Sequence, residues 1–558
     1  MKKIKNTSNP FQVSRRINKI KSSSLFGHIL EIITILFALF LSFRSVFLAG
    51  MFPGDIGDAR GNVVVLDHWY RVFTGKDSLN SFLFFYPADN VLGNSDSLFL
   101  QGTFYTALHL LGLSPVKSTI GAEILFALIG FIGVSKFLKV IIKNKLIRNF
   151  CLILIGNSYP FITAMVHPQL IGFLFIFWFA YFAIHSLRKN FSSLKNLLLA
   201  IIVCEILALS SWTALISLII YILTFGITFL IIEGWRSFTQ KSKFYFMNLQ
   251  TNFMHIRKST LIVLLSVILA LGFLWLRIYI FNIVQGNVKY DLAEITAYSP
   301  RYGDLANASS GAFGPWTELY KYFGISTSPT GERALGYPPL LLVISIILYC
   351  ALVLRNKNTK PYAKYAKLFL ATNFIVLTLI ITDDANRTPW IFVYKFVPII
   401  GSIRTLFRIN ILLTFILICI ICLVLEQISL NNRKKKIAAF ALMLILLIES
   451  IRIYPASWKE SDYLPHYSSR IMRELDKNQC EFFFIVSRNP NFNPSFLAND
   501  AIAISVESGI PTLNGNSSSF PPGWELYGVN ANTYKDPLNK WLKLNKLALN
   551  SRCLFFVD

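Results

Sequence analysis

Long apolar runs, separated by short polar segments, recur from near the start of the chain to about residue 454. A helix needs roughly 20 apolar residues to cross the hydrocarbon core of a bilayer, and these runs have about that length. They predict an α-helical polytopic membrane protein, because the strands of a membrane barrel would be shorter and would alternate in polarity. We expect about eleven transmembrane helices, at residues 26–50, 117–139, 147–165, 168–187, 196–211, 213–233, 259–281, 337–354, 366–382, 405–426 and 437–454.

Basic residues cluster in every second connection between these runs. The positive-inside rule places such connections in the cytoplasm, and the intervening ones outside. Residues 1–24 also carry seven Lys or Arg and no acid, so we predict a cytoplasmic N-terminus. The first run is too long for a typical signal peptide and is interpreted as a signal anchor. The basic connections lie at residues 139–148, 188–195, 236–258, 355–367 and 433–436.

The composition agrees with a protein whose main solvent is lipid. The chain is 54% hydrophobic and 15% aromatic, with a mean hydropathy of +0.53. The formal charge of +25 is spread between the apolar runs, so it does not form the basic surface that nucleic acid needs. Nor does a phosphate-binding glycine loop follow a predicted strand. We therefore expect membrane lipid as a partner, no nucleic acid and no nucleotide, in a bacterial inner (cell) membrane.

Three parts follow from this pattern. Residues 1–25 form a cytoplasmic basic tail, and residues 26–454 form the membrane domain, with outer loops at 51–116, 282–336 and 383–404. Residues 455–558 contain ten basic and ten acidic residues, with strand-like segments at 482–486 and 554–557 and a helical pattern at 533–550. We predict a small extracytoplasmic α/β unit with an extracytoplasmic C-terminus.

Two of the seven cysteines, Cys480 and Cys553, immediately precede the two strand-like segments. An outer compartment permits oxidation, so we hypothesise a disulfide between them, the alternative being two separate buried thiols. The other five fall in apolar runs, where a buried thiol behaves as a small hydrophobe.

The most informative polar stretch follows the first predicted helix. Asp55 and Asp58 are three residues apart, which places them on one face of a helix or around one cation, and Arg60 follows two residues later. The arginine could neutralise the carboxylates or hold a phosphate. The alternative is an ordinary capping turn with solvated carboxylates.

The order of residues in this region resembles a known family. The shared pattern comprises Gly54-Asp55, Asp58-x-Arg60, Asn62, Asp67-His68-x-Tyr70, Gly75, Phe85-Tyr86-Pro87 and Ser95-Asp96. It resembles bacterial multispanning proteins that look like GT-C glycosyltransferases and, more broadly, YfhO-like membrane proteins. The resemblance covers roughly residues 50–115 and is only architectural elsewhere.

This resemblance implies a GT-C-like fold and transfer of a sugar from a polyprenyl-phosphate donor to an envelope glycan, lipid or protein acceptor outside the membrane. The chemistry needs a carboxylate that accepts the acceptor's proton or holds a divalent cation such as Mg²⁺ or Mn²⁺, and cations that stabilise the departing phosphate. Asp55 and Asp58 match the acidic position, as catalytic residues or metal ligands.

Several basic residues are candidates for substrate binding. Arg404 and Arg408 are four residues apart and can face one groove; Arg387 precedes them, and His167 lies in a short turn between predicted helices. His68 follows the acidic stretch, as does Arg60. For each, the alternative is an interfacial side chain without a catalytic role.

Two further functions stay open at this point. A transporter or flippase of lipid-linked sugars would place charged groups within its helices, and Glu123 and Glu205 are candidates. A non-catalytic envelope-polysaccharide assembly factor would bind sugars through aromatic residues in its outer segments.

Overall fold

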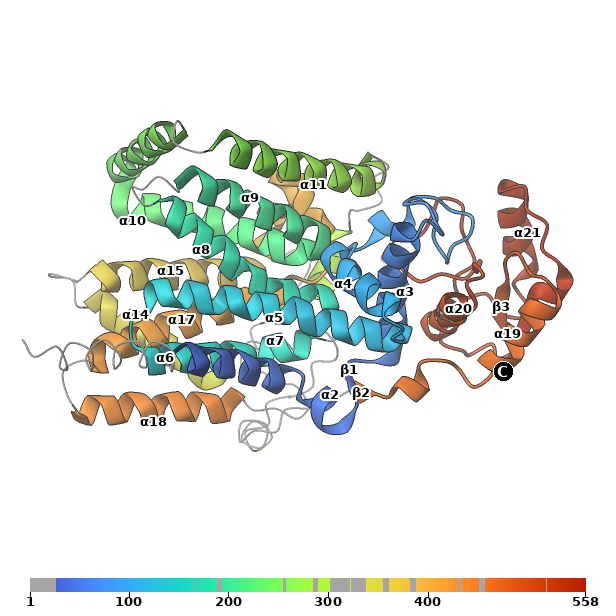
Figure 1. The fold of residues 1–558 in the computed structure, drawn as a ribbon, viewed down its shortest axis with the longest axis horizontal. Coiled ribbons are helices and arrows are strands. Elements are labelled where there is room, and N and C mark those ends of the chain that lie inside the picture. Colours follow the sequence, from blue (N-terminus) through green and yellow to red (C-terminus); the bar gives the residue numbers. More distant parts are fainter. Residues whose placement is uncertain are drawn as a thin grey trace, which may run out of the picture.

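The protein consists of a helical bundle with a smaller α/β unit at one end (Figure 1). The structure is a computed structural model, and the described residues are 27–165, 167–187, 193–253, 257–284, 290–301, 322, 338–354, 361–381, 388–429, 433–450, 457–517 and 519–558. The predicted tail 1–25 and most of the predicted outer loop 282–336 lie outside these ranges.

The bundle contains the apolar helices. Its elements are the helix Gly27–Ser42, α2 (Arg44–Ala49), α5 (Pro115–Ile141), α6 (Lys145–Gly156), α7 (Tyr159–Ala164), η2 (Pro168–Phe175), α8 (Ile176–Ser186), α9 (Ser193–Ser210), α10 (Trp212–Phe253), α11 (Lys258–Val284), α12 (Leu292–Ala297), α14 (Pro339–Leu354), α15 (Pro361–Ile380), α16 (Trp390–Phe396), η5 (Pro398–Ser402), η6 (Leu406–Arg408), α17 (Ile409–Ser429) and α18 (Arg433–Ser450).

Six helices in the described part of the chain are long and apolar enough to span a membrane. Shorter apolar helices accompany them, so the membrane character predicted from the sequence holds, while the count of about eleven spans stays a prediction. One predicted helix, 147–165, is divided. Its α6 segment ends at Gly156, and α7 begins at Tyr159 with Pro160 in its first turn, where proline can start a helix but could not continue one. The six are Pro115–Ile141, Pro168–Ser186, Trp212–Trp235, Lys258–Ile280, Ala363–Ile380 and Leu406–Gln427.

The spans differ in how far the protein itself covers them. In Leu406–Gln427, 89% of the most apolar window is buried, whereas in Lys258–Ile280 only 6% is buried. Leu269 and Phe273 on α11 are 72% and 71% exposed. The high burial of α17 places it at the centre of the bundle. Helix α11 is apolar on every side and yet exposed, which matches a lipid solvent, so it lies at the lipid-facing edge.

Helix α3 (Ile56–Phe73) lies across the end of the bundle, between the bundle and the α/β unit (Figure 1). It begins at Asp55, whose Oδ1 accepts hydrogen bonds from the backbone N–H groups of Gly57 and Asp58 at 2.7 and 3.1 Å. It packs on α4 (Phe99–Leu110) so closely that a Cβ atom at Gly102 would lie 2.2 Å from the Trp69 ring. The loop between them contains η1 (Val91–Asn94).

Residues 457–558 form the α/β unit. Two of its strands, β3 (Phe484–Ser487) and β4 (Leu554–Val557), pair in parallel, and a disulfide joins Cys480 to Cys553, the pairing hypothesised from the sequence. Both cysteines are buried. The unit's other elements are β2 (Ser457–Trp458), η7 (Glu460–Asp462), α19 (Ser468–Lys477), α20 (Pro494–Ser508), α21 (Lys535–Leu544) and η8 (Ser551–Cys553).

The α/β unit is attached to α3 by segments far apart in the sequence. β1 (Phe52–Pro53) pairs antiparallel with β2 just before α3 begins. Arg60, 5% exposed, donates through Nη1 to Asp500 on α20 at 2.5 Å and through Nε to the carbonyl oxygen of Tyr463 at 2.6 Å. Arg60 therefore attaches both α20 and the segment after η7 to α3.

Replacing Arg60 with Ala should destabilise the protein, because it leaves the Asp500 carboxylate without its cationic partner and with only the Tyr467 hydroxyl as a side-chain donor. Loss of one member of a fully buried ion pair costs about 3–5 kcal/mol, and because the Asp500 side chain is 18% exposed, we expect a cost near the lower end of that range. The measurement is thermal unfolding of the full-length protein in detergent. The matched control is Arg488→Ala, whose ion pair with Asp558 has side chains 60% and 87% exposed and should contribute less than about 1 kcal/mol. Equal shifts in Tm for the two variants would contradict the assignment.

Candidate functional site

A cavity of about 650 Å³ lies where α3, the α3–α4 loop, the α/β unit and the ends of several bundle helices meet. The residues of α3 that line it are Gly57, Asp58, Gly61, Asn62 and Val65. Their spacing corresponds to one face of a helix. A cavity of this size, with apolar walls and a few convergent polar groups, is typical of a small-molecule site.

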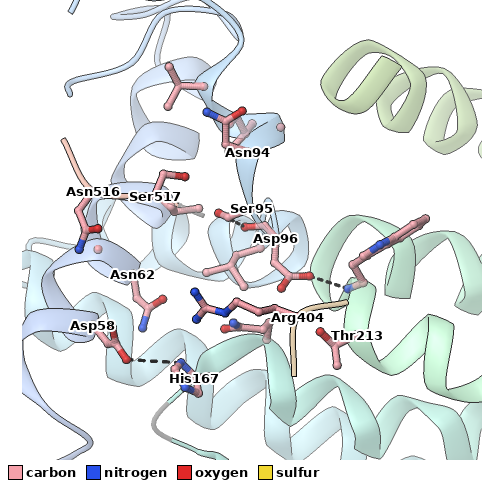
Figure 2. Close-up of a pocket in the computed structure, with 18 of the residues that line it drawn as sticks. Asp58, Asn62, Asn94, Ser95, Asp96, His167, Thr213, Arg404, Asn516 and Ser517 are labelled. Carbon is pink, nitrogen blue, oxygen red and sulfur yellow. Dashed lines mark hydrogen bonds and ion pairs between the residues drawn. The ribbon is translucent and has the colours of Figure 1, made fainter. Parts of the chain in front are cut away.

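The first polar pair in the cavity is Asp58 and His167 (Figure 2). Oδ2 of Asp58 lies 3.7 Å from Nδ1 of His167, which stands directly before η2. The carboxylate side chain is 48% exposed and the imidazole 22% exposed. A carboxylate and an imidazole therefore lie together on this side of the cavity.

A second carboxylate, Asp96, comes from the α3–α4 loop. Its Oδ1 accepts a hydrogen bond from the backbone N–H of Trp212 at 2.6 Å, at the N-terminus of α10 (Figure 2). Burial raises the pKa of Asp96 to about 6, although the Trp212 N–H and the charges of Arg408 and His167 act in the opposite direction. The carboxyl group therefore changes its protonation state near neutral pH.

Two arginines, Arg404 and Arg408, complete the charged part of the cavity. Arg404 lies between η5 and η6, with its Cζ 5.0 Å from the ring centre of Tyr298 and 5.9 Å from that of Tyr290. Its Nη1 is 3.9 Å from Glu294, and its side chain is 38% exposed. Figure 2 shows the guanidinium reaching into the cavity towards Asn62.

Four of the residues proposed from the sequence thus come together: Asp58, His167, Arg404 and Arg408 all line the cavity. Asp96 belongs to the family-like pattern but was not proposed as a site residue. The signal that could have found it was the pair Ser95-Asp96 within the family-like pattern. Its contact with residue 212 is a tertiary one that the sequence does not display.

Three other proposed residues do not line the cavity. Asp55 caps α3 with its Oδ1, and Arg60 joins α3 to the α/β unit. His68 is 2% exposed and lies 4.4 Å from the Phe82 ring, centre to centre. Burial lowers the pKa of His68 to about 4, so the ring stays neutral. Arg387 lies outside the described residues.

The donor set does not match the divalent-cation site proposed at Asp55 and Asp58. One Asp55 oxygen already accepts two backbone N–H groups, and Asp55 is absent from the cavity lining. Mg²⁺ and Mn²⁺ prefer several oxygen ligands at once, but the described part of the chain has no cluster of three or more Asp, Glu, His or Cys side chains with metal-site geometry.

A second, apolar cavity adjoins the first. It is a partly open cavity of about 320 Å³ between α8, α9, α10 and α11, and Trp275 lines both cavities. Apart from Glu205 and Cys204, its described lining consists of apolar side chains and glycine. A hydrophobic compartment among the apolar helices therefore lies beside the charged one.

No family model matches this chain, and no curated protein sequence does. Among solved structures, it is similar to the archaeal oligosaccharyltransferase AglB from Archaeoglobus fulgidus, in complex with an inhibitory peptide and a dolichol-phosphate, with a TM-score of 0.47 and 9% sequence identity. The alignment covers 88% of this chain but 65% of that one, so the chain spans less than two thirds of the neighbour's length. The likeness assigns no role to any residue of this chain.

Two glycines on the cavity face of α3 give a direct test of this geometry. A Cβ atom at Gly61 would meet nothing within 4 Å, whereas one at Gly57 would lie 3.0 Å from Oδ1 of Asp55 and 3.3 Å from Nδ2 of Asn499. Gly61→Leu should keep or raise the Tm, since a helical glycine costs about 1 kcal/mol relative to alanine. Gly57→Leu should lower stability by about 1–3 kcal/mol through overpacking. The measurement is the Tm of both variants in thermal unfolding. If Gly61→Leu lowered the Tm as much as Gly57→Leu, the space beside Gly61 would be filled rather than open.

Proposed function

We propose that this protein is a membrane glycosyltransferase that moves a sugar from a polyprenyl-phosphate donor to the hydroxyl group of an envelope glycan, lipid or protein acceptor. The observation that carries the proposal is the meeting of two arginines, two carboxylates and a histidine in one cavity at the end of an apolar helix bundle. The adjoining apolar cavity supports a lipid-linked substrate, because a chain could lie there while its phosphate reaches Arg404 and Arg408.

In this mechanism the acceptor oxygen forms a bond to the anomeric carbon of the donor sugar. The bond between that carbon and the phosphate oxygen breaks, and the lipid phosphate leaves with the electron pair. Arg404 and Arg408 stabilise the negative charge that develops on it, an effect worth most in a partly water-excluded site. Both arginines come from one short segment, with Arg404 just before η6 and Arg408 as the last residue of η6.

The proton of the acceptor hydroxyl passes to a carboxylate. We assign this step to Asp96, because a pKa of about 6 suits a group that must be ionised before the reaction and hold a proton after it. Asp58, paired with His167 on one side of the cavity, positions the acceptor. Neither role uses Asp55.

We further propose a bacterial inner membrane, with the cavity and the α/β unit on the outer side. The basic segments support this orientation. Lys139, near the end of α5, and Arg433 to Lys436, at the start of α18, lie at the end of the bundle away from the α/β unit (Figure 1). The positive-inside rule would place that end in the cytoplasm.

The test is genetic complementation with chemical readout. A deletion strain receives the wild-type gene, Asp96→Asn or Arg404→Ala, and its envelope glycans and polyprenyl-linked sugars are measured by mass spectrometry. The wild type should restore the glycan. Both variants should accumulate the lipid-linked donor, with transfer slowed by about 10²–10³-fold.

Asp55→Asn is the matched control, because asparagine also caps helices and Asp55 does not line the cavity. It should restore the glycan as the wild type does. Full restoration by Asp96→Asn and Arg404→Ala would remove the transferase assignment and favour transport or a non-catalytic assembly role. Movement of labelled lipid-linked sugar across proteoliposomes would then distinguish those two.

The rate should also depend on pH in a defined direction. The pKa of Asp96 is raised to about 6, and a proton acceptor works only when ionised, so kcat/KM for transfer should be constant above about pH 7. Below pH 6 it should fall about tenfold per pH unit. Initial rates of the purified enzyme measure this. Asp58→Asn should keep the inflexion, whereas Asp96→Asn should lose it; an unchanged inflexion in Asp96→Asn would assign the proton transfer to another group.

A further inference from the structure

One side of the cavity is formed by neutral amide and hydroxyl side chains. These are Asn62, Asn94, Ser95, Asn499, Asn516 and Ser517, hereafter the amide wall. Figure 2 shows Asn516 and Ser517 on one side of Asn62 and the Asp58–His167 pair on the other. The cavity therefore has a charged part and a neutral polar part.

The amide wall is held in place by the docking of the α/β unit. The segment before Asn516 runs beside the α3–α4 loop: the N–H of Phe85 donates to the carbonyl of Asn514 at 3.0 Å, and the N–H of Thr512 donates to that of Leu83 at 2.8 Å. Nδ2 of Asn516 donates to Oδ1 of Asn499 at 3.3 Å, and Asn499 is 4% exposed. The two amides are thus positioned before a ligand arrives.

The chemistry of the amide wall selects for uncharged hydroxyl groups. An amide offers both a donor and an acceptor, as does a serine hydroxyl, and sugar hydroxyls are complementary to both. Among the described residues, the α/β unit contributes only Asn499, Asn516 and Ser517 to the cavity, so none of its charged groups is present there. A carboxylate or ammonium group placed against Asn499, Asn516 and Ser517 would lose water without gaining a counter-charge from the α/β unit.

We propose that the amide wall binds the sugar of the lipid-linked donor and that this sugar is neutral, with neither the carboxylate of a uronic acid nor the free ammonium group of an unacetylated amino sugar. This inference rests on the proposed function, in which Arg404 and Arg408 bind the donor phosphate. The arginines then bind the phosphate, which all polyprenyl-phosphate donors share, and the amide wall binds the sugar, which differs between donors.

The experiment measures lipid binding to the full-length protein in nanodiscs. The probes are decaprenyl phosphate, its glucosyl, galactosyl and mannosyl esters, and its glucuronosyl ester. At least one neutral ester should bind about tenfold more tightly than decaprenyl phosphate, as one or two added hydrogen bonds would give. The glucuronosyl ester should show no such gain.

The double variant Asn499→Ala/Asn516→Ala should bind the preferred neutral ester within about twofold of decaprenyl phosphate, while its affinity for decaprenyl phosphate stays at the wild-type value. The single variant Asn516→Ala, which alters only a half-buried residue, should lose part of the preference. Asn491→Ala, an exposed asparagine of the same unit, is the matched control and should keep it. The Tm of each variant reports on folding.

The failures are distinguishable. No gain for any neutral ester, a gain for the glucuronosyl ester, or a preference that survives the double substitution would each overturn the amide wall as the sugar site. Arg404→Ala tests the proposed function separately. It should weaken binding of all five lipids by a similar factor, and unchanged binding in that variant would overturn the phosphate site and the inference that rests on it.

Discussion

The buried ion pair between Arg60 and Asp500 is the interaction on which the remaining architecture depends. It joins an early helix to a late unit at a separation of 440 residues. A charge taken out of water is unfavourable unless its partner is well placed, so this pair is stable in one docking geometry only. Asp58 and Asn62 line the cavity from the same helix as Arg60, so the docking of α3 on the α/β unit also determines where these two side chains lie.

The cavity combines three environments within a small volume. Arg404 and Arg408 supply positive charge, Asp96 supplies a carboxyl group that titrates near neutral pH, and Asn499 and Asn516 supply neutral hydrogen-bonding groups. Each group comes from a different segment of the chain. The apolar compartment beyond Trp275 adds a fourth environment. A substrate with a lipid chain, a phosphate and a sugar would find a matching surface for each of its parts.

The hydrophobic pattern was sufficient to predict membrane-spanning helices, because a run of apolar residues has few other stable environments. It was less informative about interruptions such as the break before Tyr159, where local turn chemistry divides one apolar run. The spacing of Arg404 and Arg408, and the position of His167 in a short turn, gave candidate residues but no contacts. Asp96 was not proposed as a site residue because its burial and its hydrogen bond from the N-terminus of α10 arise only in the folded chain. Arg60 was proposed for substrate binding because the sequence does not reveal its partner: Asp500 lies 440 residues later.

The order of the α/β unit in the chain has a consequence for biogenesis. Domains fold broadly in the order in which they are synthesised, and Asn516 and Ser517 come close to the end of this chain. Helix α3 leaves the ribosome more than 400 residues earlier than Asp500, its partner at a separation of 440 residues. Until Asp500 has been synthesised, Arg60 lacks this ion-pair partner, and the cavity lacks the lining residues of the α/β unit. Under the proposed function, the site is therefore complete only once the α/β unit, which follows the helix bundle in the sequence, has been synthesised.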